Sequence, residues 1–151
     1  MPTVSTPRLG SGLHALDGAV LDGIKVLVVD DDYRNTFALT ALLERAHARV
    51  KTAESGPDAI VALERDPGID VILMDIMMPV MDGYTAIHTI RSNAQFNSIP
   101  IIAVTGKVVA GERERCLDAG ANDYVPKPVN TAELLNAIGP WLPDVAVQPT
   151  P

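Results

Sequence analysis

Five short apolar runs alternate with five segments of helical character over most of this chain, and this alternation constrains its fold more than any other feature. The apolar runs are of strand length and lie at residues 25–30, 48–53, 69–75, 99–105 and 121–125. The helical segments lie at residues 33–47, 57–65, 82–93, 110–119 and 131–142. Such alternation predicts a parallel sheet with right-handed crossovers and helices on both faces. We therefore expect an α/β fold, a doubly wound (βα)5 sandwich whose five parallel strands take the common order 2-1-3-4-5.

Length and composition indicate one globular domain. The 151 residues suffice to bury a core, and 47% hydrophobic with 21% charged residues argues against disorder. We expect a flexible leader at residues 1–23 with a short helical turn from Leu13 to Leu21, a domain at 24–142, and a disordered Pro-rich tail at 143–151. No membrane span or signal peptide is recognisable, and the single cysteine suits a reducing compartment, so we expect a cytoplasmic protein.

The charge balance limits the partners of the chain. Lys and Arg number 12 and Asp and Glu number 19, which gives 12 − 19 = −7 and disfavours direct binding to nucleic acid. Arg113 and Arg115 alternate with Glu112 and Glu114, a pattern that indicates a solvated helical face.

Four of the apolar runs end on side chains that phosphate chemistry uses. Asp30 and Asp31 end the first run, Asp75 the third and Thr105 the fourth, and Lys127 follows the fifth. In the order 2-1-3-4-5, strands 1 and 3 are neighbours, and ligands bind outside the carboxyl ends of strands at that switch point. We therefore expect these five side chains at one edge of the sheet.

The chemistry of this set predicts a metal ion and a phosphoryl group. Three gathered carboxylates repel one another unless a cation joins them, and Mg²⁺ prefers oxygen ligands and keeps several waters. Lys127 and Thr105 could neutralise charge on the oxygens of a transferring phosphoryl group. Asp75, alone at the end of its strand, is then the natural nucleophile and would form an aspartyl phosphate.

Four motifs carry a specific resemblance. VLVVDDD, ILMDIMMPVMDGY, IIAVTG and DYVPKPV resemble, in order, spacing and strand context, the signatures of receiver domains of two-component response regulators, and together they span residues 25 to 142. The run LDGIKVLVVDDDYRN and the ending ANDYVPKPVNTAELLNAI look most like the receiver of a hybrid histidine kinase or a stand-alone receiver. The resemblance implies a flavodoxin-like fold and a phosphorylation-controlled signalling module of a two-component or phosphorelay system.

The resemblance also implies roles for single residues. Asp75 would accept a phosphoryl group from the phosphohistidine of a histidine kinase or phosphotransfer protein. Asp30 and Asp31 would organise Mg²⁺, together with Asp75 and the backbone carbonyl of Met77. Thr105 and Lys127 would contact the phosphoryl group, and the Lys127-Pro128 peptide bond would be cis.

A switch is implied as well. Thr105 would move toward the phosphoryl group and Tyr124 would turn inward, changing a surface made by the fourth helix, fifth strand and fifth helix, where a downstream protein would bind. Met77 and Lys107 occupy positions that tune the lifetime of the phosphoryl group in this family. Asp32 is expected to cap the first helix.

Two alternatives stand beside the phosphorylated switch. A phosphatase of the haloacid-dehalogenase kind would carry the motif Asp-x-Asp at the end of its first strand. In this chain Asp75 would be the first Asp of that motif, but Met77 takes the position of the second. We therefore expect no enzyme acting on outside substrates, only catalysis of the chain's own phosphorylation and dephosphorylation. The other alternative is a non-phosphorylated pseudo-receiver scaffold. The cognate kinase, the output partner and the oligomeric state are left open by the sequence.

Overall fold

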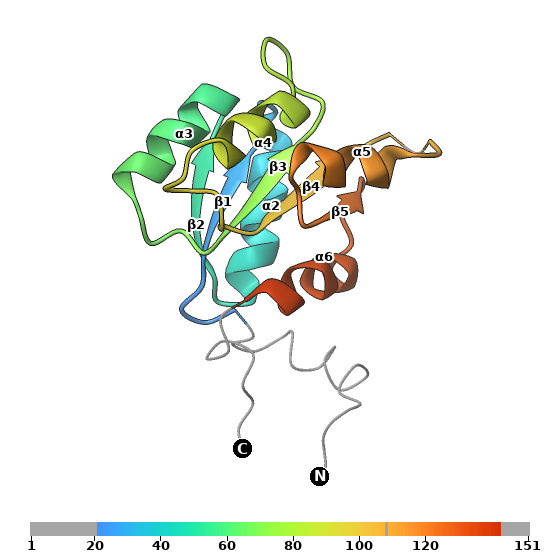
Figure 1. Ribbon diagram of the computed structural model, residues 1–151. Helices are drawn as coiled ribbons and strands as arrows, with labels where there is room; N and C mark the ends of the chain where they lie inside the picture. Colours follow the sequence, from blue (N-terminus) through green and yellow to red (C-terminus); the bar gives the residue numbers. More distant parts are fainter. Residues whose placement is uncertain (1–20, 108, 143–151) are drawn as a thin grey trace.

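The computed structural model describes residues 21–107 and 109–142, which form a central parallel sheet between two layers of helices (Figure 1). Its strands lie in the order β2-β1-β3-β4-β5, so the predicted doubly wound fold is confirmed. The elements in chain order are β1 (Lys25–Val29), α2 (Tyr33–Arg45), β2 (Arg49–Ala53), α3 (Gly56–Arg65), β3 (Val71–Asp75), α4 (Gly83–Arg91), β4 (Ile101–Thr105), α5 (Glu112–Ala119), β5 (Asp123–Pro126), α6 (Thr131–Ile138) and the short 3₁₀ helix η1 (Gly139–Trp141).

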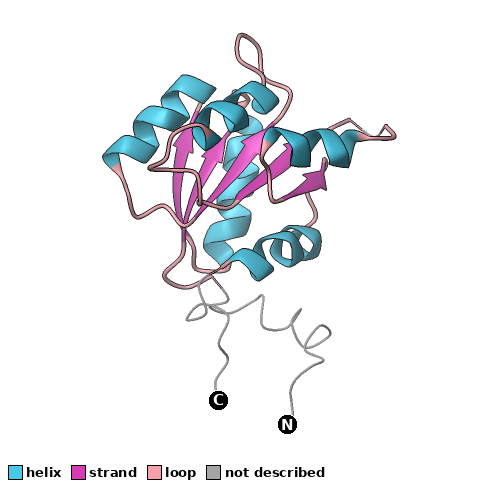
Figure 2. Cartoon of the chain, in the orientation of Figure 1, coloured by secondary structure: helices cyan, strands magenta, loops and turns pink. Residues whose placement is uncertain are grey.

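Helices cover both faces of the sheet, so each face has its own hydrophobic core (Figure 2). On one face α2 and α6 pack with buried residues such as Leu43 and Leu134 against β1, β3 and β4. On the other face α3, α4 and α5 pack with residues such as Leu63 and Ile87. All five residues of β3 and of β4 are buried, which explains why these strands read as continuous apolar runs rather than alternating ones.

Side-chain caps start four of the helices. Asp32 accepts a hydrogen bond from the backbone N–H of Arg34, as expected for a cap of the first helix. Ser55, Asp82 and Asn130 cap α3, α4 and α6 in the same way, each through an N–H three residues further on. Each cap satisfies a backbone donor that would otherwise lack a partner, and so fixes where the helix begins.

Four helices are shorter than predicted: α2 and α4 each end two residues early, and α5 and α6 differ for reasons that their own residues explain. The last helix was expected to run to residue 142, but α6 ends at Ile138 and continues as η1, because Pro140 has no N–H to donate to an α-helical carbonyl. The helix α5 begins at Glu112 rather than near residue 110, since Gly111 has a positive φ of 87° and cannot belong to the helix.

The packed domain begins earlier than residue 24. Leu21 is 1% exposed, belongs to the core on the α2 and α6 face, and donates its backbone N–H to the carbonyl of Ala46 at 2.9 Å. Leu21, which was expected in the leader, therefore packs with the domain. The rest of the expected leader, the helical turn starting at Leu13 and the tail at 143–151 lie outside the described residues. Within the described ranges, none of the helices combines the length and apolar character that crossing a bilayer requires.

Candidate functional site

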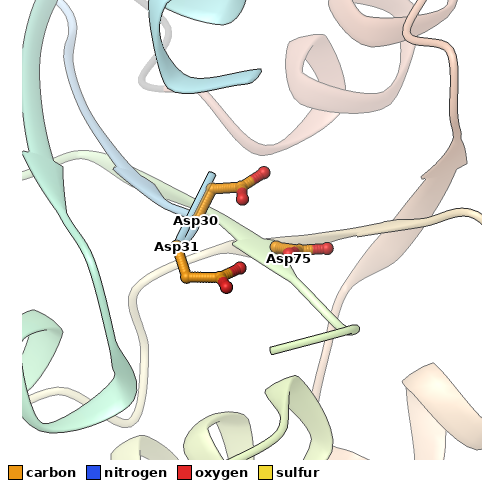
Figure 3. Close-up of side chains that lie close together, drawn as sticks. All are labelled: Asp30, Asp31 and Asp75. Atoms are coloured by element: carbon orange, nitrogen blue, oxygen red, sulfur yellow. The ribbon is translucent and has the colours of Figure 1, made fainter. Parts of the chain in front are cut away.

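The carboxyl ends of β1, β3, β4 and the segment after β5 bring the predicted side chains to one edge of the sheet. Val29 is paired with Met74, Asp75 with Val104, and Thr105 with Pro126, so the residues that follow lie side by side. In Figure 3, Asp30 and Asp31 at the end of β1 lie next to Asp75 at the end of β3. One carboxylate oxygen from each of the three residues lies within 4.8 Å of the others. The acidic cluster expected from the sequence is therefore assembled.

Lys127 forms ion pairs with two members of this cluster. Its ammonium lies 3.0 Å from Oδ1 of Asp75 and 3.6 Å from Oδ2 of Asp30. Its backbone N–H donates to the carbonyl of Thr105 at 2.8 Å, which anchors the lysine to the end of β4. The Lys127-Pro128 peptide bond is cis, as the resemblance implies. One ammonium against three carboxylates leaves an excess of negative charge in the site.

Burial makes this excess costly. Asp30 and Asp75 are each only 3% exposed, whereas Asp31 is exposed. Burial raises the pKa of Asp30, and the charge of Asp75 adds to the effect, against the opposing influence of a hydrogen bond from the N–H of Asp32 and the charge of Lys127. The pKa of Lys127 is also raised, because the hydrogen bond to Asp75 and the charges of Asp75 and Asp30 outweigh the lowering effect of burial.

One oxygen in the site is left without a hydrogen bond. Among the described residues, Oδ2 of Asp30 is buried and has no hydrogen-bond partner, because the Lys127 ammonium at 3.6 Å lies just beyond hydrogen-bond distance. A buried polar atom of this kind is normally satisfied. A divalent cation with oxygen ligands would satisfy it and would also offset the negative charge of the three carboxylates. The donor set of Asp30, Asp31 and Asp75 therefore fits Mg²⁺.

Thr105 and Met77 contact the site from two sides. Thr105 is completely buried, and its hydroxyl oxygen accepts a hydrogen bond from the N–H of Lys107 at 3.0 Å. Met77 donates its backbone N–H to Oδ1 of Asp75 at 3.2 Å, and its side chain is exposed. Met77 and Lys107 also line an open hollow of about 350 Å³ beside the acidic cluster, together with Ile76, Met78, Asp82 and Tyr84. The tuning role expected of Met77 and Lys107 stays a prediction.

Tyr124 lies further from the cluster. It is half-buried on β5, pairs in register with Ala103, and packs against the core on the α3, α4 and α5 face. Two residues, Val125 and Pro126, separate Tyr124 from the carboxyl end of β5. The inward turn expected of Tyr124 stays a prediction.

Sequence reasoning missed a polar pair close to the site and misread one of its residues. Glu112 was expected on a solvated face, but it is only 2% exposed, and the hydroxyl of Tyr84 lies 2.6 and 2.7 Å from its two carboxylate oxygens. The alternating charges around Glu112 concealed its burial. The spacing of Glu112 and Cys116, four residues apart, was the available signal, since it places the carboxylate on the same helix face as an apolar neighbour.

This fold and site define a class of doubly wound α/β modules that gather carboxylates and a lysine at a topological switch point. The chain belongs to the family of response regulator receiver domains, whose model matches residues 26–139. It is thus a receiver domain of two-component and phosphorelay signalling, and the pseudo-receiver alternative finds no support.

Two relatives illustrate the settings in which this domain occurs. The protein PilH of Pseudomonas aeruginosa is 40% identical over 114 residues, which cover 76% of this chain and 93% of PilH. The signal transduction histidine-protein kinase BarA of Escherichia coli K12 is 38% identical over 144 residues. These cover 91% of this chain but only 16% of BarA.

Two solved structures resemble the fold and bear on the site. The receiver domain of the sensor histidine kinase PA1611 from Pseudomonas aeruginosa, solved with a magnesium ion coordinated in its active-site cleft, has a TM-score of 0.72 and 39% identity over 79% of this chain and 97% of that domain. The receiver domain of Ssk1 from Saccharomyces cerevisiae, crystallised with the histidine phosphotransfer protein Ypd1, gives a TM-score of 0.74 and 29% identity over 83% of this chain and 93% of its own.

Proposed function

We propose that Asp75 accepts a phosphoryl group from a phosphohistidine of a histidine kinase or phosphotransfer protein. A carboxylate oxygen of Asp75 forms a bond to phosphorus while the phosphorus–nitrogen bond of the donor breaks, and the imidazole leaves with a proton from solvent. The observation that carries this proposal is the contact of a buried Asp75 with Lys127 at 3.0 Å, beside the carboxylate of Asp30. Later attack of water on phosphorus would release phosphate and restore Asp75.

The residues around Asp75 have separate roles in this step. Lys127, released from Asp75 by the incoming group, pairs with a phosphoryl oxygen, and Thr105 donates its hydroxyl to another. Asp30, Asp31, Asp75 and the carbonyl of Met77 would hold Mg²⁺, which supplies positive charge against the phosphoryl oxygens. The magnesium ion in the cleft of the PA1611 receiver supports this part of the proposal.

The signal follows from a change in the position of Thr105. To donate its proton to a phosphoryl oxygen, the Thr105 hydroxyl would shift toward Asp75, and the N–H of Lys107 that it accepts from would shift with it, so phosphorylation favours a second arrangement of this segment. Tyr124 then packs further inward, and the surface of α5, β5 and α6 changes for a downstream protein. Arg113 and Asp123, 3.9 Å apart across α5 and β5, are charged groups of that surface.

The first test is the intact mass of the protein after incubation with a small acyl phosphate. We expect one added phosphoryl group that requires Mg²⁺, is lost in hydroxylamine and is absent from Asp75→Asn. Asparagine keeps the shape of the side chain but lacks the nucleophilic carboxylate. A folded protein that binds Mg²⁺ but gains no mass, with rapid loss excluded by quenching at short times, would speak for a scaffold instead.

The donor protein is proposed to dock on the α2 side of the site. Tyr33 and Phe37 lie one helical turn apart at the start of α2, directly after the acidic residues, and are 80% and 74% exposed. Met77 and Val80 of the loop after β3 are exposed as well. Exposed apolar side chains around a polar site suit a protein partner. The complex of a similar receiver with Ypd1 supports a phosphotransfer protein as that partner. The proposed location is the cytoplasm, where ATP is present to phosphorylate the histidine kinase.

Phe37→Ala is expected to lower the rate of phosphoryl transfer from a phosphorylated phosphotransfer protein about tenfold, as for loss of an aromatic anchor in an interface. The rate from a small acyl phosphate should stay unchanged, because Phe37 does not contact the acidic cluster. Val61→Ala on α3 is the matched control, since Val61 is also an exposed apolar residue but lies on a helix of the opposite face. Equal rates for Phe37→Ala and wild type with the protein donor would contradict this docking surface.

A further inference from the structure

Glu112 and Tyr84 form a buried pair that the chemistry at Asp75 does not use directly. Among the described residues, no lysine or arginine forms an ion pair with Glu112, although its side chain is almost fully buried. Its carboxylate is instead held by the hydroxyl of Tyr84 and by Sγ of Cys116, which lies 3.7 Å from Oε2. A buried carboxylate is costly without such donors, so the Tyr84 hydroxyl is its main support.

Tyr84 is attached to the acceptor strand through its neighbour Gly83. The N–H of Gly83 donates to the carbonyl of Ile76 at 2.9 Å. A Cβ atom at Gly83 would lie only 2.5 Å from the carbonyl oxygen of Asp75 and from Cα of Ile76. The first turn of α4 therefore lies directly against the end of β3, and the position of Tyr84 depends on the backbone at Asp75.

Lys107 connects the same tyrosine to Thr105. The N–H of Lys107 donates to the Thr105 hydroxyl, and its ammonium lies 5.6 Å from the centre of the Tyr84 ring. The guanidinium of Arg115 lies 4.4 Å from that ring centre. Both cations are within the range of cation–π attraction, and one of them, Lys107, also contacts Thr105. The hydrogen bond to Glu112 keeps the ring in this position.

We infer that Tyr84 and Glu112 are positioning residues that restrain phosphoryl transfer, because they hold Lys107, and through it the Thr105 hydroxyl, in the arrangement that precedes the reaction. The inference rests on the proposed function of Asp75. To donate its proton to a phosphoryl oxygen, the Thr105 hydroxyl has to shift toward Asp75, and its contact with the N–H of Lys107 has to shift with it; this is easier when Lys107 is less firmly held. Loss of the Tyr84–Glu112 hydrogen bond then shifts the population toward the arrangement that the phosphorylated state favours.

The test compares Tyr84→Phe with wild type, using a small acyl phosphate as donor at saturating Mg²⁺. Phenylalanine keeps the ring and removes only the hydroxyl. We expect phosphoryl acceptance to become about threefold to tenfold faster, which corresponds to only part of the strength of a hydrogen bond to a charged group. Glu112→Gln retains an acceptor oxygen for Tyr84 and is expected to restore most of the wild-type rate relative to Glu112→Ala.

Arg91→Met is the matched control. Arg91 joins the far ends of the same two helices, since its Nε donates to the carbonyl of Gly120 and Nη2 to the side chain of Asn122, both at 2.8 Å. Its loss should lower the thermal midpoint without changing the phosphorylation rate, because it touches neither Lys107 nor Thr105. A merely structural role for Tyr84 predicts that both variants behave alike.

The possible outcomes distinguish a failure of the positioning role from a failure of the proposed phosphorylation of Asp75. If wild type gains no phosphoryl group, the proposed function fails. If wild type is phosphorylated and Tyr84→Phe reacts at the same rate or more slowly, or Arg91→Met accelerates equally, only the positioning role is overturned. Should Tyr84→Phe not fold, the rates of Glu112→Gln and Glu112→Ala decide: a faster alanine variant supports the role, and equal rates reject it.

Discussion

Lys127→Met is expected to slow phosphoryl transfer to Asp75 from a small acyl phosphate on the order of 100-fold, while the domain stays folded. The ammonium is the only lysine or arginine group within ion-pair distance of Asp75 among the described residues, and it is already in place before a phosphoryl group arrives. Removing one preorganised group that stabilises developing charge typically costs a factor of about 100 to 1,000. The measurement is the rate of phosphoprotein formation at short times by quenched-flow and intact mass.

Lys25→Met is the control that matches this change. Lys25 has an ion pair of the same length, 3.0 Å to Asp66, and its side chain is 23% exposed against 24% for Lys127. It stands at the start of β1, at the opposite end of the sheet from the acidic cluster. We expect Lys25→Met to lower stability slightly and to leave the rate unchanged. A rate for Lys127→Met within threefold of wild type would remove Lys127 from the proposed chemistry.

Asp30→Asn is expected to stabilise the metal-free domain and to abolish most of its stabilisation by Mg²⁺. Asparagine removes one of three crowded charges, and its amide can donate to the carboxylate of Asp75. We expect a gain of about 1 to 2 kcal/mol in the free energy of unfolding without metal, or about 3 to 8 °C in Tm. In wild type, Mg²⁺ at about 100 times its Kd should add about 2.7 kcal/mol. The measurement is thermal unfolding with EDTA and with Mg²⁺.

The pH dependence of this gain has a definite sign. The pKa of Asp30 is raised in the folded state. Its contribution to stability is therefore fully present below the ordinary pKa of 3.8, where the carboxyl group is protonated, and is lost as pH rises through the folded-state pKa. The advantage of Asp30→Asn in EDTA should therefore grow as pH rises above about 4. Asp32→Asn is the control: it removes a neighbouring charge outside the cluster while asparagine still caps α2. A lower Tm for Asp30→Asn in EDTA would contradict the account of crowded carboxylates.

The strand order and the acidic cluster could be predicted because each depends on local patterns that agree. Strands such as β3 are buried on both faces and read as unbroken apolar runs, and the alternation with helices then dictates parallel pairing. Once β1 and β3 are neighbours, Asp30 and Asp75 must meet. The cap residue Asp32 was likewise recognisable, because capping requires contact with a residue only two positions away.

Features that depend on distant contacts were not predictable. Glu112 looks like any charged residue of an exposed helix until Tyr84, 28 positions earlier, is placed beside it. Leu21 was assigned to the leader since nothing in its own surroundings shows that it packs against Ala46, which lies beyond β1 and α2. The early end of α6 is a different case, because Pro140 is a local signal for the end of a helix. The prediction gave more weight to the helical spacing of the apolar residues around it.

The position of Leu21 has an architectural consequence. Leu21 and Leu142, the first and last described residues, both belong to the core on the α2 and α6 face. In Figure 1 both ends of the coloured ribbon lie at the lower edge of the sheet, opposite the edge where β1 and β3 end. A further domain joined at either end would start far from the entrance to Asp75. The same module can therefore be built into chains of quite different design, as a free unit or as one segment among many, without blocking its own reactive centre.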